Sequence, residues 1–184
     1  MDNIKLPSEP VHQPIHLDFN DIARTIDYFN DNSHKKQLLA LIKLGADSGA
    51  RAQELYQLKP YDIDLENRTV YINHRPASGQ TTKTKQSRVS FFTEETKKVL
   101  ADYLNGSDNS CPFPQTTVSR LFSNAPIRIK HLRKYFSQTW TRNNGNNAVK
   151  KILMGHSTRN DVDLQHYNIQ STDELKRIYD LVMK

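Results

Sequence analysis

Thr69-Val-Tyr-Ile-Asn73 and Ser87-Arg-Val-Ser-Phe-Phe92 are two short runs rich in β-branched and aromatic residues. Runs of this composition and length are typical of β-strands. The polar stretch between them contains Pro76, Gly79 and two lysines. We therefore predict a small antiparallel sheet whose two strands are joined by a long basic hairpin.

Helical patterns precede the hairpin on its N-terminal side. Apolar residues recur with the helical period after Asp18 and Asn20, either of which could cap a first helix. A second helix is predicted to start near Ser33 and to end near Gly49. A short third helix is predicted over 51–58.

Helical patterns also follow the hairpin. Thr93 is predicted to cap a helix that continues through Leu104, and a last helix over 171–183 opens with Ser171 and Glu174 as a capping box. Further helices are predicted over 116–123, 128–140 and 147–154. Residues 1–16 contain three prolines and are predicted to form a linker or arm. The predicted fold of 17–184 is mostly α with a small antiparallel β-sheet (α+β).

The composition limits the classes of function. A chain of 184 residues suits one domain, and its formal net charge of +6 favours a polyanionic partner such as nucleic acid. The sequence has no run of 18 apolar residues, and its first ten residues lack the apolar core of a secretory signal. The single cysteine, Cys111, cannot form an internal disulfide. We therefore expect a cytoplasmic protein with no membrane contact.

The segment Asp47-Ser-Gly-Ala-Arg-Ala-Gln-Glu-Leu55 contains the first candidate site residues. The guanidinium of Arg51 could give two parallel hydrogen bonds to a phosphate. Glu54, three residues later on the adjacent helical face, could orient it. Taken alone, such a pair is also common on ordinary protein surfaces.

Four further candidate segments follow in order along the chain. Lys83 and Lys85 lie in the basic hairpin. The next segment, Ile129-Lys-His-Leu-Arg-Lys-Tyr-Phe136, contributes Lys130, His131, Arg133 and Lys134. His156 follows the predicted helix 147–154, and Tyr167 follows His156 by eleven residues.

This order of motifs resembles that of tyrosine recombinases and integrases, and it implies their catalytic-domain fold. The resemblance implies that Tyr167 attacks the scissile phosphate and forms a 3′-phosphotyrosyl bond. It implies that the charge on the phosphate is stabilised by Arg51, Lys130, Arg133 and His156. Lys83, with Lys85 as the alternate, would protonate the leaving 5′ oxygen. Glu54 and His131 would support the site, and Arg88 and Lys134 would contact DNA.

Two features depart from the usual family pattern. Lys130 stands where the family usually has histidine, and His131 lies about 100° around the helix from it. With lysine at this position, the motif resembles that of integrases from archaeal spindle-shaped viruses of the fusellovirus type. The gap between His156 and Tyr167 is also longer than is usual in the family.

The resemblance implies a recombinase that integrates or excises a viral or plasmid genome without metal, cofactor or ATP. Its partners would be a double-stranded DNA attachment site and further copies of the chain. We expect the upstream core-binding domain of such enzymes to be absent. Sequence leaves open whether Tyr167 acts in cis or in trans, and whether the C-terminal helix is exchanged between subunits.

Three other functions remain possible from sequence. A type IB topoisomerase or a telomere resolvase would share the chemistry. A DNA-binding module with a degenerate site would share only the charge. A metal nuclease would use Asp161, Asp163 and a histidine.

Overall fold

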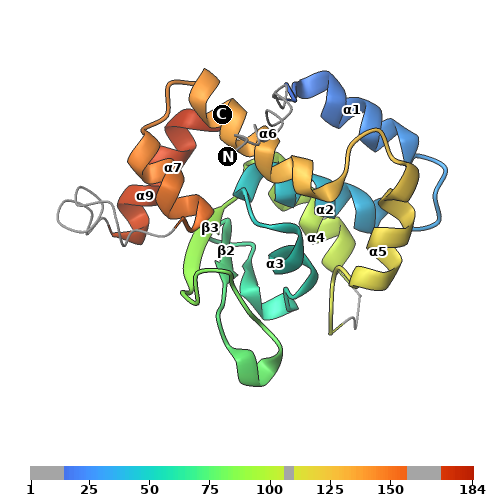
Figure 1. The fold of residues 1–184 in the computed structure, drawn as a ribbon, viewed down its shortest axis with the longest axis horizontal. Helices are drawn as coiled ribbons and strands as arrows, with labels where there is room; N and C mark the ends of the chain where they lie inside the picture. The colour runs from blue at the N-terminus through green and yellow to red at the C-terminus, as the bar shows by residue number, and fades with distance from the viewer. Residues whose placement is uncertain (1–14, 106–109, 157–170) are drawn as a thin grey trace, which may run out of the picture.

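The computed structural model describes residues 15–105, 110–156 and 171–184. Its α-helices are α1 (Phe19–Tyr28), α2 (Lys35–Ser48), α3 (Ala52–Tyr56), α4 (Glu94–Leu104), α5 (Gln115–Leu121), α6 (Ile129–Arg142), α7 (Asn147–Met154) and α9 (Thr172–Val182). Its strands are β1 (Ile63–Asp64), β2 (Thr69–Ile72) and β3 (Arg88–Phe91), which form an antiparallel sheet in that order. Figure 1 shows the β2–β3 hairpin extending away from the helices.

Helix α2 lies at the centre of the domain and packs on both α4 and α6. Four of its apolar side chains are fully buried, as expected for a helix that packs on more than one neighbour: Leu38, Leu41, Ile42 and Leu44. A Cβ atom on Gly45 would lie 2.8 Å from Cδ1 of Leu132 on α6. Glycine at this position therefore allows the two helices to approach closely.

Two clusters of buried side chains make up the core. The first surrounds α2 and includes Ile129 and Leu132 from the start of α6. The second includes Phe136 and Trp140 from the rest of α6, together with side chains of β3, α7 and α9. Helix α6 thus extends from one cluster to the other, with Arg133 between the two pairs of buried residues.

The structure confirms most of the predicted elements. Asp18 caps α1, Gly49 follows α2, Thr93 caps α4 and Ser171 caps α9. The two predicted strands pair in antiparallel fashion, with Val70 opposite Ser90. The second helix begins at Lys35, two residues later than predicted, and its N-cap makes no side-chain hydrogen bond.

The short strand β1 was not predicted. It has two residues and pairs with the start of β2. Two residues are too few to produce an alternating pattern, so the strand depends on its partner. The hairpin loop also contains a 3₁₀ turn, Pro76–Ser78, and an isolated bridge between Arg75 and Gln80.

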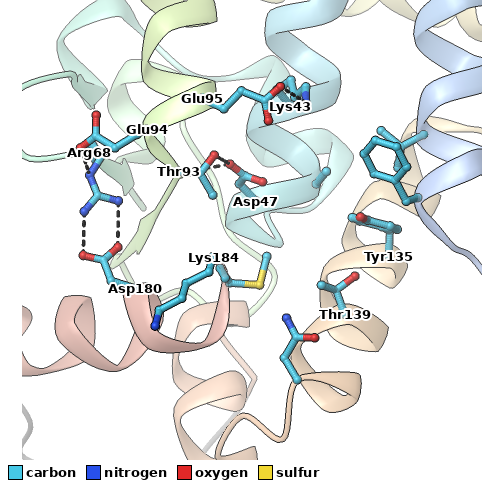
Figure 2. Close-up of a pocket in the computed structure, with 15 residues that line it drawn as sticks. Lys43, Asp47, Arg68, Thr93, Glu94, Glu95, Tyr135, Thr139, Asp180 and Lys184 are labelled. Carbon is cyan, nitrogen blue, oxygen red and sulfur yellow. Dashed lines mark hydrogen bonds and ion pairs between the residues drawn. The ribbon is translucent and has the colours of Figure 1, made fainter.

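Helix α9 packs against its own chain. Leu175, Tyr179 and Met183 are buried in the second core cluster. A cavity of about 610 Å³ adjoins the helix. In its lining Arg68 makes two parallel hydrogen bonds to Asp180, at 2.8 and 2.6 Å (Figure 2). The Tyr179 hydroxyl donates to the backbone oxygen of Asp47 at 3.1 Å. The described helix is therefore docked in cis.

Several predictions fall partly or wholly outside the described residues. These are the arm over 1–16, of which only the last two residues are described, the nucleophile Tyr167, and the candidate metal ligands Asp161 and Asp163. Within the described ranges, no helix is long and apolar enough to cross a bilayer. The same ranges contain no cluster of three or more metal-ligating side chains.

Candidate active site

The first site residues lie where α2 turns into α3. Gly49 has a left-handed φ of 62°, and Arg51 is the N-cap of α3. A Cβ atom on Gly49 would lie 2.5 Å from the Phe136 ring, so this turn requires glycine. The backbone N–H of Arg51 donates to Oε2 of Glu54 at 2.7 Å, and its Nη1 donates to Oε1 at 2.9 Å. The predicted contact between Arg51 and Glu54 is confirmed.

Glu54 is bound by a second arginine as well. Nη1 of Arg88 donates to Oε1 at 3.0 Å, and Nη2 donates to Oε2 at 2.7 Å. Burial tends to raise the pKa of Glu54, but the hydrogen bonds and charges of Arg88 and Arg51 hold it below the ordinary glutamate value. One ionised carboxylate therefore joins two guanidinium groups.

Arg133 is the third arginine at this site. Its Nη1 donates to the backbone oxygens of Gly49 at 2.6 Å and Met154 at 2.7 Å. Desolvation, reinforced by the charges of Arg51 and Arg88, lowers the pKa of Arg133 to about 10, so it stays protonated near pH 7. Its Nε and Nη2 have no hydrogen-bond partner among the described residues, and these two donors remain free for a ligand.

The C-terminal turn of α7 brings the three arginines together. Three consecutive backbone oxygens each accept from a different arginine: Leu153 from Nε of Arg88 at 2.9 Å, Met154 from Nη1 of Arg133 at 2.7 Å, and Gly155 from Nη2 of Arg51 at 3.2 Å. The last carbonyls of a helix have no partner within it and carry partial negative charge. The end of α7 therefore suits guanidinium groups electrostatically.

His156 follows this turn directly. Gly155 ends α7 with a φ of 64°, and the backbone N–H of His156 donates to the backbone oxygen of Lys151 at 3.0 Å. Partial desolvation and the charges of Arg133 and Arg51 lower the pKa of His156, so its imidazole is neutral near pH 7. The side chain remains exposed beside the arginines.

Residues 16–174 match the model of the phage integrase family. The chain belongs to this family. It is 29% identical over 148 residues to tyrosine recombinase XerA of Saccharolobus solfataricus, a match that covers 76% of this chain and 48% of that protein. The chain therefore spans about half the length of this curated relative.

Solved structures of recombinases and integrases share the fold. The crystal structure of XerA recombinase aligns with a TM-score of 0.62 at 21% identity, covering 93% of this chain and 66% of that one. The Tn1549 transposon integrase, in complex with transposon right end DNA, aligns with a TM-score of 0.62 at 16% identity, covering 97% of this chain and 69% of that one. The catalytic domain of bacteriophage HP1 integrase aligns with a TM-score of 0.54 at 19% identity, covering 90% of this chain and 87% of that one. These likenesses confirm the predicted fold.

Lys130, which we expected at the family's usual histidine position, is exposed in the first turn of α6. His131 is half-buried, and its Nδ1 accepts from the backbone N–H of Arg128 at 3.3 Å. Desolvation and the neighbouring charges of Lys130, Lys134 and Arg128 lower the pKa of His131. In the described structure, His131 therefore caps α6 and makes no hydrogen bond to Arg133. Lys134 is half-buried one residue beyond Arg133.

The two lysines of the hairpin are exposed. Their turn is closed by Thr82, whose hydroxyl accepts from the N–H of Gln86 at 3.1 Å and donates to its backbone oxygen at 2.9 Å. Lys85 adopts a left-handed φ of 56° in this turn. Among the described residues, no hydrogen bond joins Lys83 or Lys85 to the three arginines.

The base of the hairpin is attached to the end of α3. Buried Gln80 donates to the backbone oxygen of Gln57 at 3.1 Å and to Oδ2 of Asp62 at 2.7 Å. The N–H of Thr81 donates to Oε1 of Gln57 at 2.7 Å. The loop with Lys83 is therefore fixed to α3, the helix that Arg51 caps.

Arg88 has different surroundings from those expected of a DNA-contacting residue. Its side chain is 8% exposed, and all three of its nitrogens bind Glu54 or Leu153. No signal in the sequence indicates this burial, because the alternation of Val89 and Phe91 favours the other face of the strand as the buried one. Only the structure shows that Arg88 shares a face with the fully buried Ser90.

The Gly155→Ala substitution is expected to destabilise the domain by about 2–4 kcal/mol. The left-handed backbone disfavours alanine, and the new Cβ would lie 2.7 Å from Cδ of Arg88, which Glu54 and Leu153 hold in place. Denaturant unfolding measures the change. Gly79→Ala is the matched control, because its φ is 77° and a Cβ atom there meets nothing within 4 Å. Equal losses in the two variants would contradict a role for the Arg88 contact.

Proposed function

We propose that this chain is the DNA-cleaving part of a site-specific tyrosine recombinase. Tyr167 attacks the scissile phosphate, forming a 3′-phosphotyrosyl bond and releasing a 5′ hydroxyl. Attack by the 5′ hydroxyl of another strand reverses the step, so the bond energy is conserved. Membership of the phage integrase family supports this activity.

The observation that carries the proposal is the charge at the α7 turn. Three guanidinium groups meet at that turn, and a single carboxylate binds two of them, which leaves an excess of two positive charges beside His156. Such a site matches the negative charge that develops on a phosphodiester under attack. Arg51, Arg133, Lys130 and His156 would stabilise that charge, with the free donors of Arg133 directed to the non-bridging oxygens.

Lys83, with Lys85 as the alternate, would protonate the leaving 5′ oxygen. The anchoring of the hairpin to Gln57 supports this role, because a proton donor must be held near the reacting atoms. Lys134 would contact the DNA backbone. Lys130 would act as a cation that neutralises charge on the phosphate.

The partners would be a double-stranded attachment site and further copies of the chain, in the cytoplasm of the host cell. We further propose a source among archaeal spindle-shaped viruses or their integrated relatives. Lys130 at the usual histidine position supports this proposal, together with the archaeal origin of the XerA relative.

The test is incubation of the full chain with a panel of nicked half-site DNAs, followed by mapping of the DNA-linked peptide. The nick lets the cleaved fragment diffuse away, so a covalent adduct accumulates. We expect one adduct, on Tyr167. A different linked tyrosine would contradict the assignment, and DNA binding without any adduct would indicate a binding module. Relaxation of supercoiled DNA without recombinant products would favour a topoisomerase.

A further inference from the structure

Arg88 is enclosed at the centre of the site and cannot reach a bound phosphate in this conformation. Its side chain is 8% exposed, and its guanidinium is bound to Glu54 by two parallel hydrogen bonds. Its remaining nitrogen, Nε, donates to the backbone oxygen of Leu153 at 2.9 Å. Arg88 therefore connects α3 to the last turn of α7.

Gly155 packs directly on the same side chain. A Cβ atom there would lie 2.7 Å from Cδ of Arg88 and 2.8 Å from its Nε and Nη1. The backbone oxygen of Gly155 accepts from Arg51, and the next residue is His156. The position of Arg88 therefore constrains the turn Leu153–Gly155, which binds Arg51 and leads directly into His156.

We propose that Arg88 is a positioning residue that holds Arg51 and His156 in register with each other. It acts on Arg51 through Glu54, and on His156 through the Leu153–Gly155 turn. This inference rests on the proposed function for its catalytic consequence. The positioning itself is a property of the protein without DNA.

A planar guanidinium is needed for this role because it binds three acceptors in one plane with fixed angles. Lysine keeps the charge but offers a single nitrogen, which cannot bind both oxygens of Glu54 and Leu153 with the same geometry. A displacement of about 1 Å in a catalytic group can reduce a rate by roughly 100-fold. Charge alone therefore does not substitute for the arginine at position 88.

The first arm of the experiment measures single-turnover adduct formation on nicked DNA at saturating concentration. We expect Arg88→Lys and Arg88→Met to reduce the rate roughly 100-fold, with DNA affinity within about threefold of wild type. The control is Val118→Ala, which removes buried volume from the first core cluster. It should lower stability and keep the rate. A rate in Arg88→Lys equal to wild type would overturn the requirement for the planar group.

A double variant separates positioning from a direct contact. If Arg88 acts on Arg51 through Glu54, then adding Arg88→Met to Glu54→Gln should reduce the rate less than Arg88→Met does alone. A fully additive loss would overturn that route. A loss of DNA affinity with an unchanged saturated rate would make Arg88 a DNA contact and overturn the proposal.

The second arm is independent of cleavage. Amide hydrogen exchange of the DNA-free protein reports on the N–H groups of Gly155 and His156, which donate to Ile152 and Lys151. We expect exchange at both amides to rise at least about tenfold in Arg88→Met, with amides of α4 unchanged. Unchanged exchange at Gly155 and His156 would overturn the inference. A wild-type protein that forms no adduct would contradict the proposed function alone.

Discussion

Replacing Tyr167 with phenylalanine is expected to abolish covalent trapping of nicked DNA, because the substitution removes the oxygen that bonds to phosphorus. DNA binding should persist, since the charged groups that bind phosphate are unchanged. Denaturing electrophoresis of the protein–DNA mixture measures the adduct, and a mobility shift under native conditions measures binding. Adducts that persist in Tyr167→Phe would contradict the assignment of this residue as the nucleophile.

Tyr179 provides the matched control, because it is the other tyrosine that follows His156 in the sequence. It is fully buried, and its hydroxyl donates to the backbone oxygen of Asp47. Burial, with the nearby charge of Asp47, raises the pKa of Tyr179 well above the ordinary tyrosine value. Tyr179→Phe should therefore keep full trapping and lose about 1 kcal/mol of stability through the missing hydrogen bond.

Glu54→Gln is expected to destabilise the domain by about 3–5 kcal/mol, which is a large part of the stability of a typical domain. The side chain is 2% exposed, and the substitution leaves three neighbouring guanidinium groups without a carboxylate. The new amide would also direct N–H donors at the donors of Arg51 and Arg88. The midpoint and slope of denaturant unfolding give the change in free energy.

The surface ion pair between Lys36 and Asp102 supplies the control for Glu54. Both side chains are more than half exposed, at 61% and 62%. Water and salt screen such a pair, so Asp102→Asn should change the unfolding free energy by less than about 1 kcal/mol. A comparable loss in the two variants would show that Glu54 is not held in a desolvated ion network.

The pH dependence of the Glu54 effect follows from its lowered pKa. A carboxylate whose pKa falls on folding stabilises the protein at pH values above its pKa in the unfolded chain. The contribution is lost as the pH falls through its pKa in the folded protein. The difference between wild type and Glu54→Gln should therefore be largest near neutral pH. It should shrink below the ordinary glutamate pKa of 4.5, where Glu54 of the unfolded chain begins to protonate, and it should be lost as the pH falls through the lower pKa of the folded protein.

Local signals in the sequence determined the order and type of the elements. Asp18, Thr93 and Ser171 cap helices because their side chains accept from backbone N–H groups three residues later. Gly49 ends α2 because the backbone there is left-handed. These interactions span a few residues, so they can be read without the fold. The contact between Arg51 and Glu54 was predictable for the same reason.

The tertiary structure alone decided how the site is assembled. Glu54 meets Arg88 across 34 positions of sequence, and Arg51 meets Gly155 across 104. No local pattern reports such contacts, because they exist only when α3, β3, α6 and α7 are packed. Sequence identified Arg51, Arg133 and His156 as members of one ordered set. Only the fold, through three backbone oxygens at the end of a helix, brought the arginines to one turn and enclosed Arg88 among them.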